Sequence, residues 1–174
     1  MIVLSGPPGA GKSTVAELLV AQFARSALVT GDAFFTFVRS GYVEPWLPEA
    51  EAQNTVITRS AASAAGQIVR GGYTVVYDGV IGPWFIDRFT QWAGLSAVHY
   101  AVLLPSEDTC IERVRRRADH GFTDEPAARH MWREFAHADL DPRQVIRVND
   151  GDDPTWTARA VRERVAAGRL RRPA

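Results

Sequence analysis

The strongest chemical signal in the sequence is a glycine-rich segment close to its first residue. Residues 6–13 read Gly-Pro-Pro-Gly-Ala-Gly-Lys-Ser, which fits the pattern GxxxxGK[ST]. In this pattern the glycines let backbone N–H groups turn inward around phosphate oxygens, the lysine reaches the outer phosphates, and the serine offers a hydroxyl to magnesium. The segment therefore predicts a site for the phosphates of a nucleotide. The residues expected to bind it are Gly6, Pro7, Pro8, Gly9, Ala10, Gly11, Lys12, Ser13 and Thr14.

The composition makes the lysine of this segment distinctive. Lys12 is the only lysine of the chain, whereas 19 arginines supply every other basic side chain. Arg and Lys are nearly equivalent on a solvated helix face, but they differ where a site needs a compact ammonium group. The alternative interpretation, an ordinary glycine-rich turn, does not account for this placement.

Two carboxylates follow apolar segments that are predicted to be strands. Asp32 comes after the segment 27–30, and Asp78 comes directly after the almost wholly apolar segment 73–77. At the edge of a parallel sheet, Asp78 is placed to hold magnesium together with Ser13. A turn-forming Asp-Gly is the alternative for Asp78, and contact with the substrate is a second possible role for the Asp78-Gly79 segment. A cap of the following helix is the alternative for Asp32.

The pattern of apolar residues predicts the elements that must hold these groups. Five short apolar segments alternate with segments of helical periodicity along the chain. The predicted strands cover residues 2–4, 27–30, 73–77, 97–104 and 145–148. The predicted helices cover residues 12–23, 49–70, 84–93, 106–117, 126–139 and 154–167, followed by a frayed basic tail at 168–174. The alternation predicts an α/β fold, a three-layer α/β/α sandwich whose mostly parallel sheet binds ligands at the carboxyl ends of its strands.

Length and composition limit the classes of protein that the chain can be. It has 174 residues, enough for one domain, and its 20 basic residues balance its 20 acidic residues, which predicts no general affinity for nucleic acid. Its single cysteine, Cys110, forms no internal disulfide. No segment has the roughly 18 consecutive apolar residues of a membrane span. We expect a cytoplasmic protein, monomer or homodimer, with neither nucleic acid nor membrane as partner.

The order of these features resembles that of a known family. The segment 6–13, the Gly31-Asp32 pair after a short second strand, and the arginine-rich break before a late helix are similar to the small P-loop kinases of the nucleotide and shikimate kinase group. That group includes gluconate kinase, adenylylsulfate kinase, chloramphenicol phosphotransferase and the zeta-toxin kinases. The likeness covers nearly the whole chain, although only the first loop is a sharp motif. It implies one P-loop kinase domain over residues 1–174, with a five-stranded parallel sheet in the order 2-3-1-4-5.

The resemblance also implies catalytic roles. Asp32 would orient the acceptor hydroxyl and take its proton. A mobile lid would lie at about residues 114–126 and bring an arginine to the transferring phosphoryl group. Arg117 is the residue chosen for that contact, and Arg116 is the second choice.

The same resemblance indicates how the nucleotide is recognised. By position, Arg113 looks like the arginine that stacks on adenine in shikimate-type kinases, and Pro154 looks like its partner on the other face of the ring. No Asn-Lys-x-Asp or Thr-Lys-x-Asp motif for guanine is present. ATP is therefore the expected donor, with Mg²⁺ as the expected metal ion.

The acceptor is expected to bind at about residues 33–70, between the second and third strands. Aromatic side chains are dense there, and Trp46 lies in a proline-flanked loop, where functional residues are common. At least half of these aromatic residues are expected in the core. An aromatic-lined slot suits a small, partly apolar alcohol, whereas Arg39 and Arg59 could grip a carboxylate or phosphate. The residues chosen for contact with the acceptor are Asp32, Phe35, Arg39, Trp46, Arg59 and Trp84.

These features together predict an ATP- and Mg²⁺-dependent kinase that phosphorylates a hydroxyl of a small molecule, such as a sugar, a nucleoside or an antibiotic-like alcohol. The nearest alternative enzyme is a nucleoside monophosphate kinase, which would need more arginines facing the acceptor. The alternative of a different class is a non-catalytic ATP-binding switch module that changes partners with its nucleotide state. Turnover that depends on an acceptor would separate the enzymes from the switch.

Overall fold

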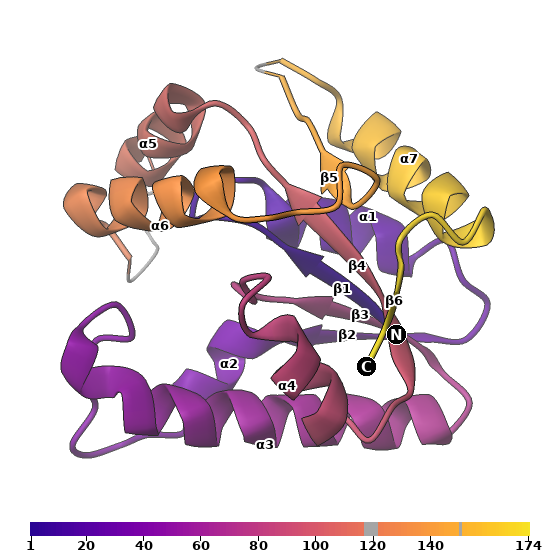
Figure 1. Cartoon of the computed structure of the whole chain (residues 1–174), viewed down its shortest axis with the longest axis horizontal. Helices are drawn as coiled ribbons and strands as arrows, with labels where there is room; N and C mark the ends of the chain where they lie inside the picture. Colours follow the sequence, from indigo (N-terminus) through magenta and orange to yellow (C-terminus); the bar gives the residue numbers. More distant parts are fainter. Residues whose placement is uncertain (117–121, 150) are drawn as a thin grey trace.

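The sheet at the centre of the molecule forms from the short apolar segments of the sequence (Figure 1). A computed structural model of the chain describes residues 1–116, 122–149 and 151–174. The strands are β1 (Ile2–Ser5), β2 (Ser26–Thr30), β3 (Thr74–Asp78), β4 (Ala97–Leu103), β5 (Val145–Ile146) and β6 (Arg171–Pro173). Neighbours in the order β2-β3-β1-β4-β5 pair in parallel, which confirms the predicted α/β fold and strand order.

Helices cover both faces of this sheet. The helices are α1 (Lys12–Val20), α2 (Gly31–Phe35), α3 (Glu51–Arg70), α4 (Ile86–Trp92), α5 (Glu107–Arg116), α6 (Glu125–His137) and α7 (Pro154–Ala166), with a 3-10 turn at Pro48–Ala50. Figure 1 shows α2, α3 and α4 on one side of the sheet and α1 and α7 on the other. The helices α5 and α6 pack against each other near the carboxyl ends of the strands. Within the described part of the chain, no helix combines the length and the apolar content that crossing a bilayer requires.

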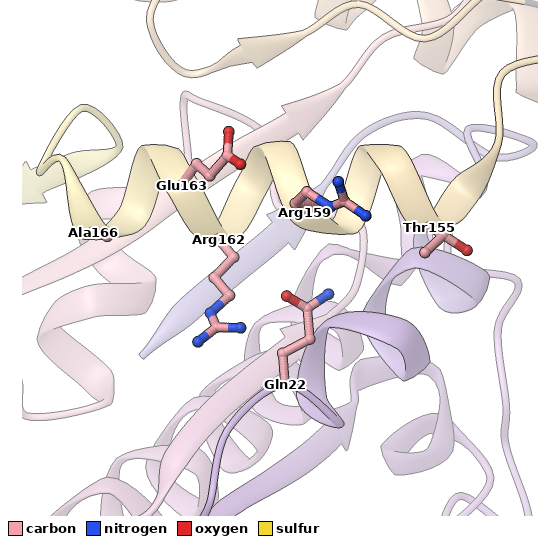
Figure 2. Close-up of a pocket in the computed structure, with 6 residues that line it drawn as sticks. All are labelled: Gln22, Thr155, Arg159, Arg162, Glu163 and Ala166. Atoms are coloured by element: carbon pink, nitrogen blue, oxygen red, sulfur yellow. The ribbon is translucent and has the colours of Figure 1, made fainter.

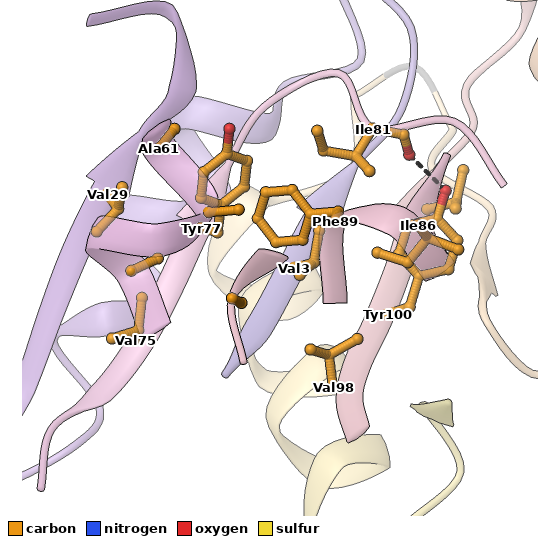
Figure 3. Close-up of a cluster of buried hydrophobic side chains, with 14 of the residues drawn as sticks. Val3, Val29, Ala61, Val75, Tyr77, Ile81, Ile86, Phe89, Val98 and Tyr100 are labelled. Atoms are coloured by element: carbon orange, nitrogen blue, oxygen red, sulfur yellow. Dashed lines mark hydrogen bonds between the residues drawn. The ribbon is translucent and has the colours of Figure 1, made fainter. Parts of the chain in front are cut away.

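Two buried apolar clusters attach the helices to the sheet. The cluster under α3 and α4 contains Tyr77 and Phe89, whose ring centroids lie 4.6 Å apart (Figure 3). The cluster under α1 and α7 contains Leu19 and Val76. Because successive residues of a strand point to opposite faces, Tyr77 faces α4 and Asp78 faces α1. β3 therefore carries its terminal carboxylate toward the helix that follows the glycine-rich loop.

The last residues of the chain differ from the predicted frayed tail. Leu170 is fully buried, and β6 pairs antiparallel with Ala97–His99 of β4. The reason lies in the neighbouring strand, since β5 has two residues that pair only with Val102 and Leu103. The amino end of β4 is left open, and β6 covers it, because unpaired backbone groups next to a core are costly. The sheet thus has a sixth, antiparallel strand.

Side-chain caps account for the start of two helices near the site. The Ser106 hydroxyl accepts a hydrogen bond from the N–H of Thr109 at 3.2 Å and caps α5. Asp124 accepts a hydrogen bond from the N–H of Ala127 at 2.9 Å and caps α6. These caps fix where α5 and α6 begin.

Candidate functional site

The loop between β1 and α1 has a backbone that requires glycine at two positions. Gly6 and Gly9 adopt positive φ angles of 140° and 80°. A side chain on Gly6 would collide with the carbonyl group of Leu103, and a side chain on Gly9 would collide with the backbone of Cys110. The loop therefore lies directly against the end of β4 and against α5, and these contacts fix its curvature.

The amino end of α1 is open to an anion. Its N-cap is Gly11, which provides no side-chain cap, and Ser13 and Thr14 of the first turn are exposed. The Lys12 ammonium reaches back over the loop and donates a hydrogen bond to the carbonyl oxygen of Pro7 at 3.1 Å. Uncapped N–H groups and the helix dipole attract negative charge, and Lys12 adds a full positive charge beside them. This arrangement fits a phosphate group.

A buried hydrogen-bond network, which the sequence pattern did not predict, joins this loop to the loop after β3. Ser5 donates its hydroxyl to the carbonyl oxygen of Ile81 at 2.8 Å and accepts the N–H of Ile81 at 2.9 Å. Tyr100 donates to the same carbonyl oxygen at 2.6 Å, as the dashed line in Figure 3 marks. Ser5 lies directly before the glycine-rich loop, so the network fixes that loop relative to the residues after Asp78. The sequence signal that could have indicated this network is the presence of two hydroxyl-bearing residues, Ser5 and Tyr100, in otherwise apolar strand segments.

Asp78 ends β3 with a side chain that is only 4% exposed. In the sheet it stands beside Leu4 of β1 and Thr30 of β2. It lies on the face that α1 covers, and α1 carries Ser13 in its first turn. A carboxylate and a hydroxyl are oxygen donors of the kind that Mg²⁺ prefers, so this donor set fits the predicted metal ion. In the residues that the structure describes, no group of three or more His, Cys, Asp or Glu side chains forms an alternative metal site.

Asp32 lies in the first turn of α2 with an exposed side chain. The N-cap of this helix is Thr30, so the interpretation of Asp32 as a helix cap is wrong. Thr30 pairs with Asp78, which brings the turn after β2 next to the turn after β3. Burial raises the pKa of Tyr77, and the carboxylates of Asp32 and Asp78 raise it further. Both candidate carboxylates therefore affect the pKa of the same buried phenol.

Arg113 contacts the glycine-rich loop from α5. Its half-buried guanidinium donates a hydrogen bond from Nη1 to the carbonyl oxygen of Gly9 at 3.4 Å. Pro154, its predicted partner around adenine, is the exposed first residue of α7. Arg113 is thus beside the loop that is predicted to hold the phosphates, whereas its contact with adenine remains a prediction.

The arginines that follow Arg113 on α5 are paired with acidic side chains. Arg115 forms a two-point ion pair with Glu125 of α6, and Arg116 pairs with Glu112 one turn earlier. Both arginines are exposed, so each pair contributes little to stability. Arg117, the residue predicted to contact the transferring phosphoryl group, lies outside the described residues, as does the middle of the predicted lid.

The loop before α3 is held by side chains of that helix. Gln53 accepts a hydrogen bond from the N–H of Val43 at 2.9 Å and donates one to the carbonyl oxygen of the same residue at 2.6 Å. Asn54 donates to the carbonyl oxygen of Pro45 at 2.7 Å. These bonds hold the backbone on the amino side of Trp46 against α3.

Two tryptophans that were predicted to contact the acceptor reach toward the α5–α6 hairpin. Trp46 lies edge-to-face with Phe122, with ring centroids 4.7 Å apart. Trp84 lies 5.5 Å from the ring of Phe135 of α6 and is 58% exposed. The loops after β2 and β3 are thereby both in contact with the region around α5 and α6.

The other side chains predicted to contact the acceptor are less enclosed. Phe35 is half-buried at the end of α2, whereas Arg39 and Arg59 are exposed. Large apolar side chains are also exposed in the segments that follow β2 and β3, and we call them the apolar rim. The apolar rim consists of Phe37, Tyr42, Leu47, Val56, Val80 and Trp84.

Two hollows of the surface are lined by residues outside the apolar rim. One has a volume of about 490 Å³ and lies between the end of α1 and α7 (Figure 2). Its lining residues are Gln22, Thr155, Arg159, Arg162, Glu163 and Ala166. The other, of about 450 Å³, lies between Phe135 of α6 and Arg164 of α7. Neither contains a residue that was predicted to bind the nucleotide or the acceptor.

Comparisons with known proteins agree with this architecture. The profile of the AAA domain family matches residues 1–142. A sugar kinase from Janibacter sp. HTCC2649 has a TM-score of 0.71 at 16% identity, covering 95% of this chain and 93% of that chain. A gluconokinase from Sinorhizobium meliloti 1021 has a TM-score of 0.63 at 20% identity, covering 95% and 91%. These matches confirm the resemblance to P-loop small-molecule kinases and the shared fold.

One curated relative matches over a short stretch. An adenylate kinase from Syntrophomonas wolfei is 55% identical over 40 residues. That stretch is 23% of this chain and 19% of the adenylate kinase, so the match spans less than a fifth of that enzyme.

Proposed function

The chain belongs to the AAA domain family, and on this premise we propose that it is an ATP-dependent phosphotransferase. It moves the γ-phosphoryl group of ATP to a hydroxyl group of a small molecule. The observation that carries the proposal is the loop between β1 and α1, which combines positive-φ glycines, an uncapped helix start and Lys12. A cradle of this kind holds nucleotide phosphates and leaves the terminal one open to attack.

The transfer in this proposal begins with the acceptor hydroxyl beside Asp32. The Asp32 carboxylate accepts the hydroxyl proton while the acceptor oxygen forms a bond to the γ-phosphorus. The bond from the γ-phosphorus to the oxygen shared with the β-phosphate breaks, and ADP leaves with that electron pair. Lys12 and the N–H groups of the loop stabilise the negative charge that moves to the β-phosphate.

Further residues complete the nucleotide side of the proposal. Ser13 and Asp78 would hold Mg²⁺, which supplies positive charge beside the phosphate oxygens when it is bound. Arg113 and Pro154 enclose the adenine ring, and Arg117 contacts the transferring phosphoryl group. The lid covers about residues 114–126 and the acceptor region about residues 33–70 of one kinase domain, which acts in the cytoplasm as a monomer or homodimer.

The apolar rim supports a partly apolar alcohol as the acceptor. Six of the eight large apolar side chains that are exposed in the described residues belong to it. Exposed apolar side chains that gather beside a polar site commonly mark where a ligand binds. In this rim, burial raises the pKa of Tyr42, and Glu44 and Asp32 raise it further. A sugar, nucleoside or antibiotic-like alcohol with an apolar part is therefore the proposed class.

A nucleoside monophosphate is the second candidate acceptor. The short match with an adenylate kinase favours it. In that case Arg39 and Arg59, both exposed in the acceptor region, would bind the phosphate of the acceptor.

The proposal is tested by screening acceptors for ADP release with ATP and Mg²⁺, and by identifying the phosphorylated product by mass spectrometry. The set includes alcohols with and without apolar substituents and the four nucleoside monophosphates. We expect ADP release above the acceptor-free rate with apolar-substituted alcohols, and loss of that release in Asp32→Asn. Release with nucleoside monophosphates alone would favour the second candidate. ATP binding without release for any acceptor would contradict an enzyme and favour an ATP-binding switch module.

A further inference from the structure

Each proposed carboxylate has a glycine beside it in the sequence, and both glycines lie against the same side chain. Gly31 precedes Asp32 at the start of α2, and Gly79 follows Asp78 after β3. A Cβ atom on Gly31 would lie 2.5 Å from the hydroxyl oxygen of Tyr77. A Cβ atom on Gly79 would lie 2.8 Å from Cε1 of the same tyrosine. The Tyr77 side chain therefore occupies the space between the two turns.

The Tyr77 side chain cannot withdraw from this position without opening the core. It is 2% exposed and lies edge-on to Phe89. Figure 3 shows the hydroxyl oxygen of Tyr77 directed away from the Phe89 ring. On the neighbouring strand, Val29 pairs with Tyr77 in the parallel register that also aligns the turn after β2 with Asp78. Core packing on one side and the two glycines on the other thus enclose the phenol.

We propose that Tyr77 is a positioning residue that sets the separation between Asp32 and Asp78. Its ring and hydroxyl form a spacer of fixed size between the turn after β2 and the turn after β3. This inference rests on the proposed function, in which Asp32 holds the acceptor and Asp78 belongs to the nucleotide side. The spacer then determines how the acceptor oxygen is aligned with the γ-phosphorus.

The hydroxyl of Tyr77 is the distinctive part of the spacer. An apolar ring alone would satisfy the core, as Phe89 does in the same cluster. Burying a hydroxyl group carries a desolvation cost that a phenylalanine would avoid. The oxygen is also the atom that stands closest to the place of a Cβ on Gly31. This position places the oxygen against the turn that leads into Asp32, which is where a spacer would act.

The test is a double-mutant cycle between Tyr77 and Gly31. Tyr77→Phe removes only the oxygen, and we expect kcat for the acceptor to fall about tenfold while the Kd for ATP stays unchanged, because small misplacements of reacting groups are costly. Gly31→Ala introduces a methyl group that meets the oxygen, and kcat falls as well. In the Tyr77→Phe background the nearest atom to that methyl group is Cζ at 3.1 Å. The double variant should therefore recover kcat relative to Gly31→Ala alone.

Gly79→Ala is the matched control. Its methyl group would meet Cε1, which Tyr77→Phe retains, so the same background should give no recovery. A general loosening of the core would instead relieve both alanine variants equally.

Thermal unfolding of the same variants provides a readout that needs no acceptor. We expect Gly31→Ala to lower the Tm and Tyr77→Phe to reverse part of that decrease. The decrease in Tm caused by Gly79→Ala should persist in the Tyr77→Phe background. If the wild-type chain transfers no phosphoryl group, the proposed function fails, and the Tm cycle still decides whether the spacer exists. Additive Tm losses, an unchanged kcat in Tyr77→Phe, or equal recovery of both alanine variants would overturn the proposal.

Discussion

The proposed nucleotide side and the proposed acceptor side of the site differ in how they are built. On the nucleotide side, Gly6 and Gly9 pack so closely against β4 and α5 that they accept no side chain. Ser5 and Tyr100 fix the base of the same loop through buried hydrogen bonds. On the proposed acceptor side, the apolar rim consists of exposed side chains on loops and on α3. Backbone geometry defines the first side, whereas side-chain identity defines the second.

This difference indicates which part of the site can change during evolution. A loop whose curvature depends on contacts between backbones tolerates few substitutions, since each added Cβ atom would displace a strand or a helix. Exposed side chains on loops exchange at little cost to the fold. We therefore expect binding of the nucleotide to be a property of the scaffold, and selection of the acceptor to be a property of this particular chain.

The largest expected effect comes from removing the ammonium on the nucleotide side. Lys12→Ala should weaken ATP binding by about a hundredfold and abolish turnover, because a charged hydrogen-bond donor to the phosphates is lost. Equilibrium dialysis with labelled ATP measures the affinity. Lys12→Arg is the matched control, since it keeps the charge and changes its shape. Normal turnover in Lys12→Arg would show that the compact ammonium is not required.

The next effect should separate the two sides. Asp32→Asn keeps the size of the side chain and removes the proton acceptor, so transfer to the acceptor should slow by about a hundredfold or more. The affinity for ATP, measured by calorimetry, should stay at the wild-type value. Normal turnover of Asp32→Asn would remove Asp32 from the role of base, and weakened ATP binding would place it on the nucleotide side.

A smaller effect is expected at Arg113, which joins α5 to the glycine-rich loop. Arg113→Gln should weaken ATP binding about tenfold and change kcat much less, because a hydrogen bond to a charged group contributes about 1.5–3 kcal/mol. Arg115→Gln is the control on the same helix, because Arg115 is exposed and paired with Glu125. If kcat fell more than the affinity in Arg113→Gln, Arg113 would act on the transferring phosphoryl group instead.

The smallest effect should be confined to the acceptor side. Gln53→Ala removes both hydrogen bonds to Val43 and loosens the loop that carries Trp46. We expect the KM for the acceptor to rise about three- to tenfold, as for the loss of one or two neutral hydrogen bonds. The KM for ATP should not change. Gln67→Ala on the same helix is the control, and a rise in the KM for ATP in Gln53→Ala would show that the two sides are not independent.

The parts of the structure that follow from local patterns could be predicted from the sequence. Continuous apolar segments such as 73–77 gave the parallel strands, because strands covered on both faces leave no place for polar residues. The pattern of residues 6–13 predicted the glycine-rich loop, because glycine and lysine at that spacing are typical of one backbone geometry, that of a phosphate-binding loop between a strand and a helix. Both predictions depend on residues that are close together in the chain.

The parts that depend on distant partners could not be predicted in the same way. β6 forms because β5 is too short to cover β4, and neither fact is visible in residues 168–174 themselves. The bonds between Ser5 and Ile81 join residues 76 positions apart, and the approach of Tyr77 to Gly31 requires two strands in register. Side-chain contacts of the acceptor region, such as Trp46 with Phe122, are likewise set by packing and not by periodicity.

In the proposed function, the first loop binds a nucleotide through its phosphates. Calorimetric titration of the whole chain with ATP, ADP and adenosine, each with and without Mg²⁺, tests it directly. We expect saturable heat with ATP and ADP at one site per chain, and no measurable heat with adenosine. The absence of heat with ATP under both metal conditions, or equal affinity for adenosine and ATP, would contradict it.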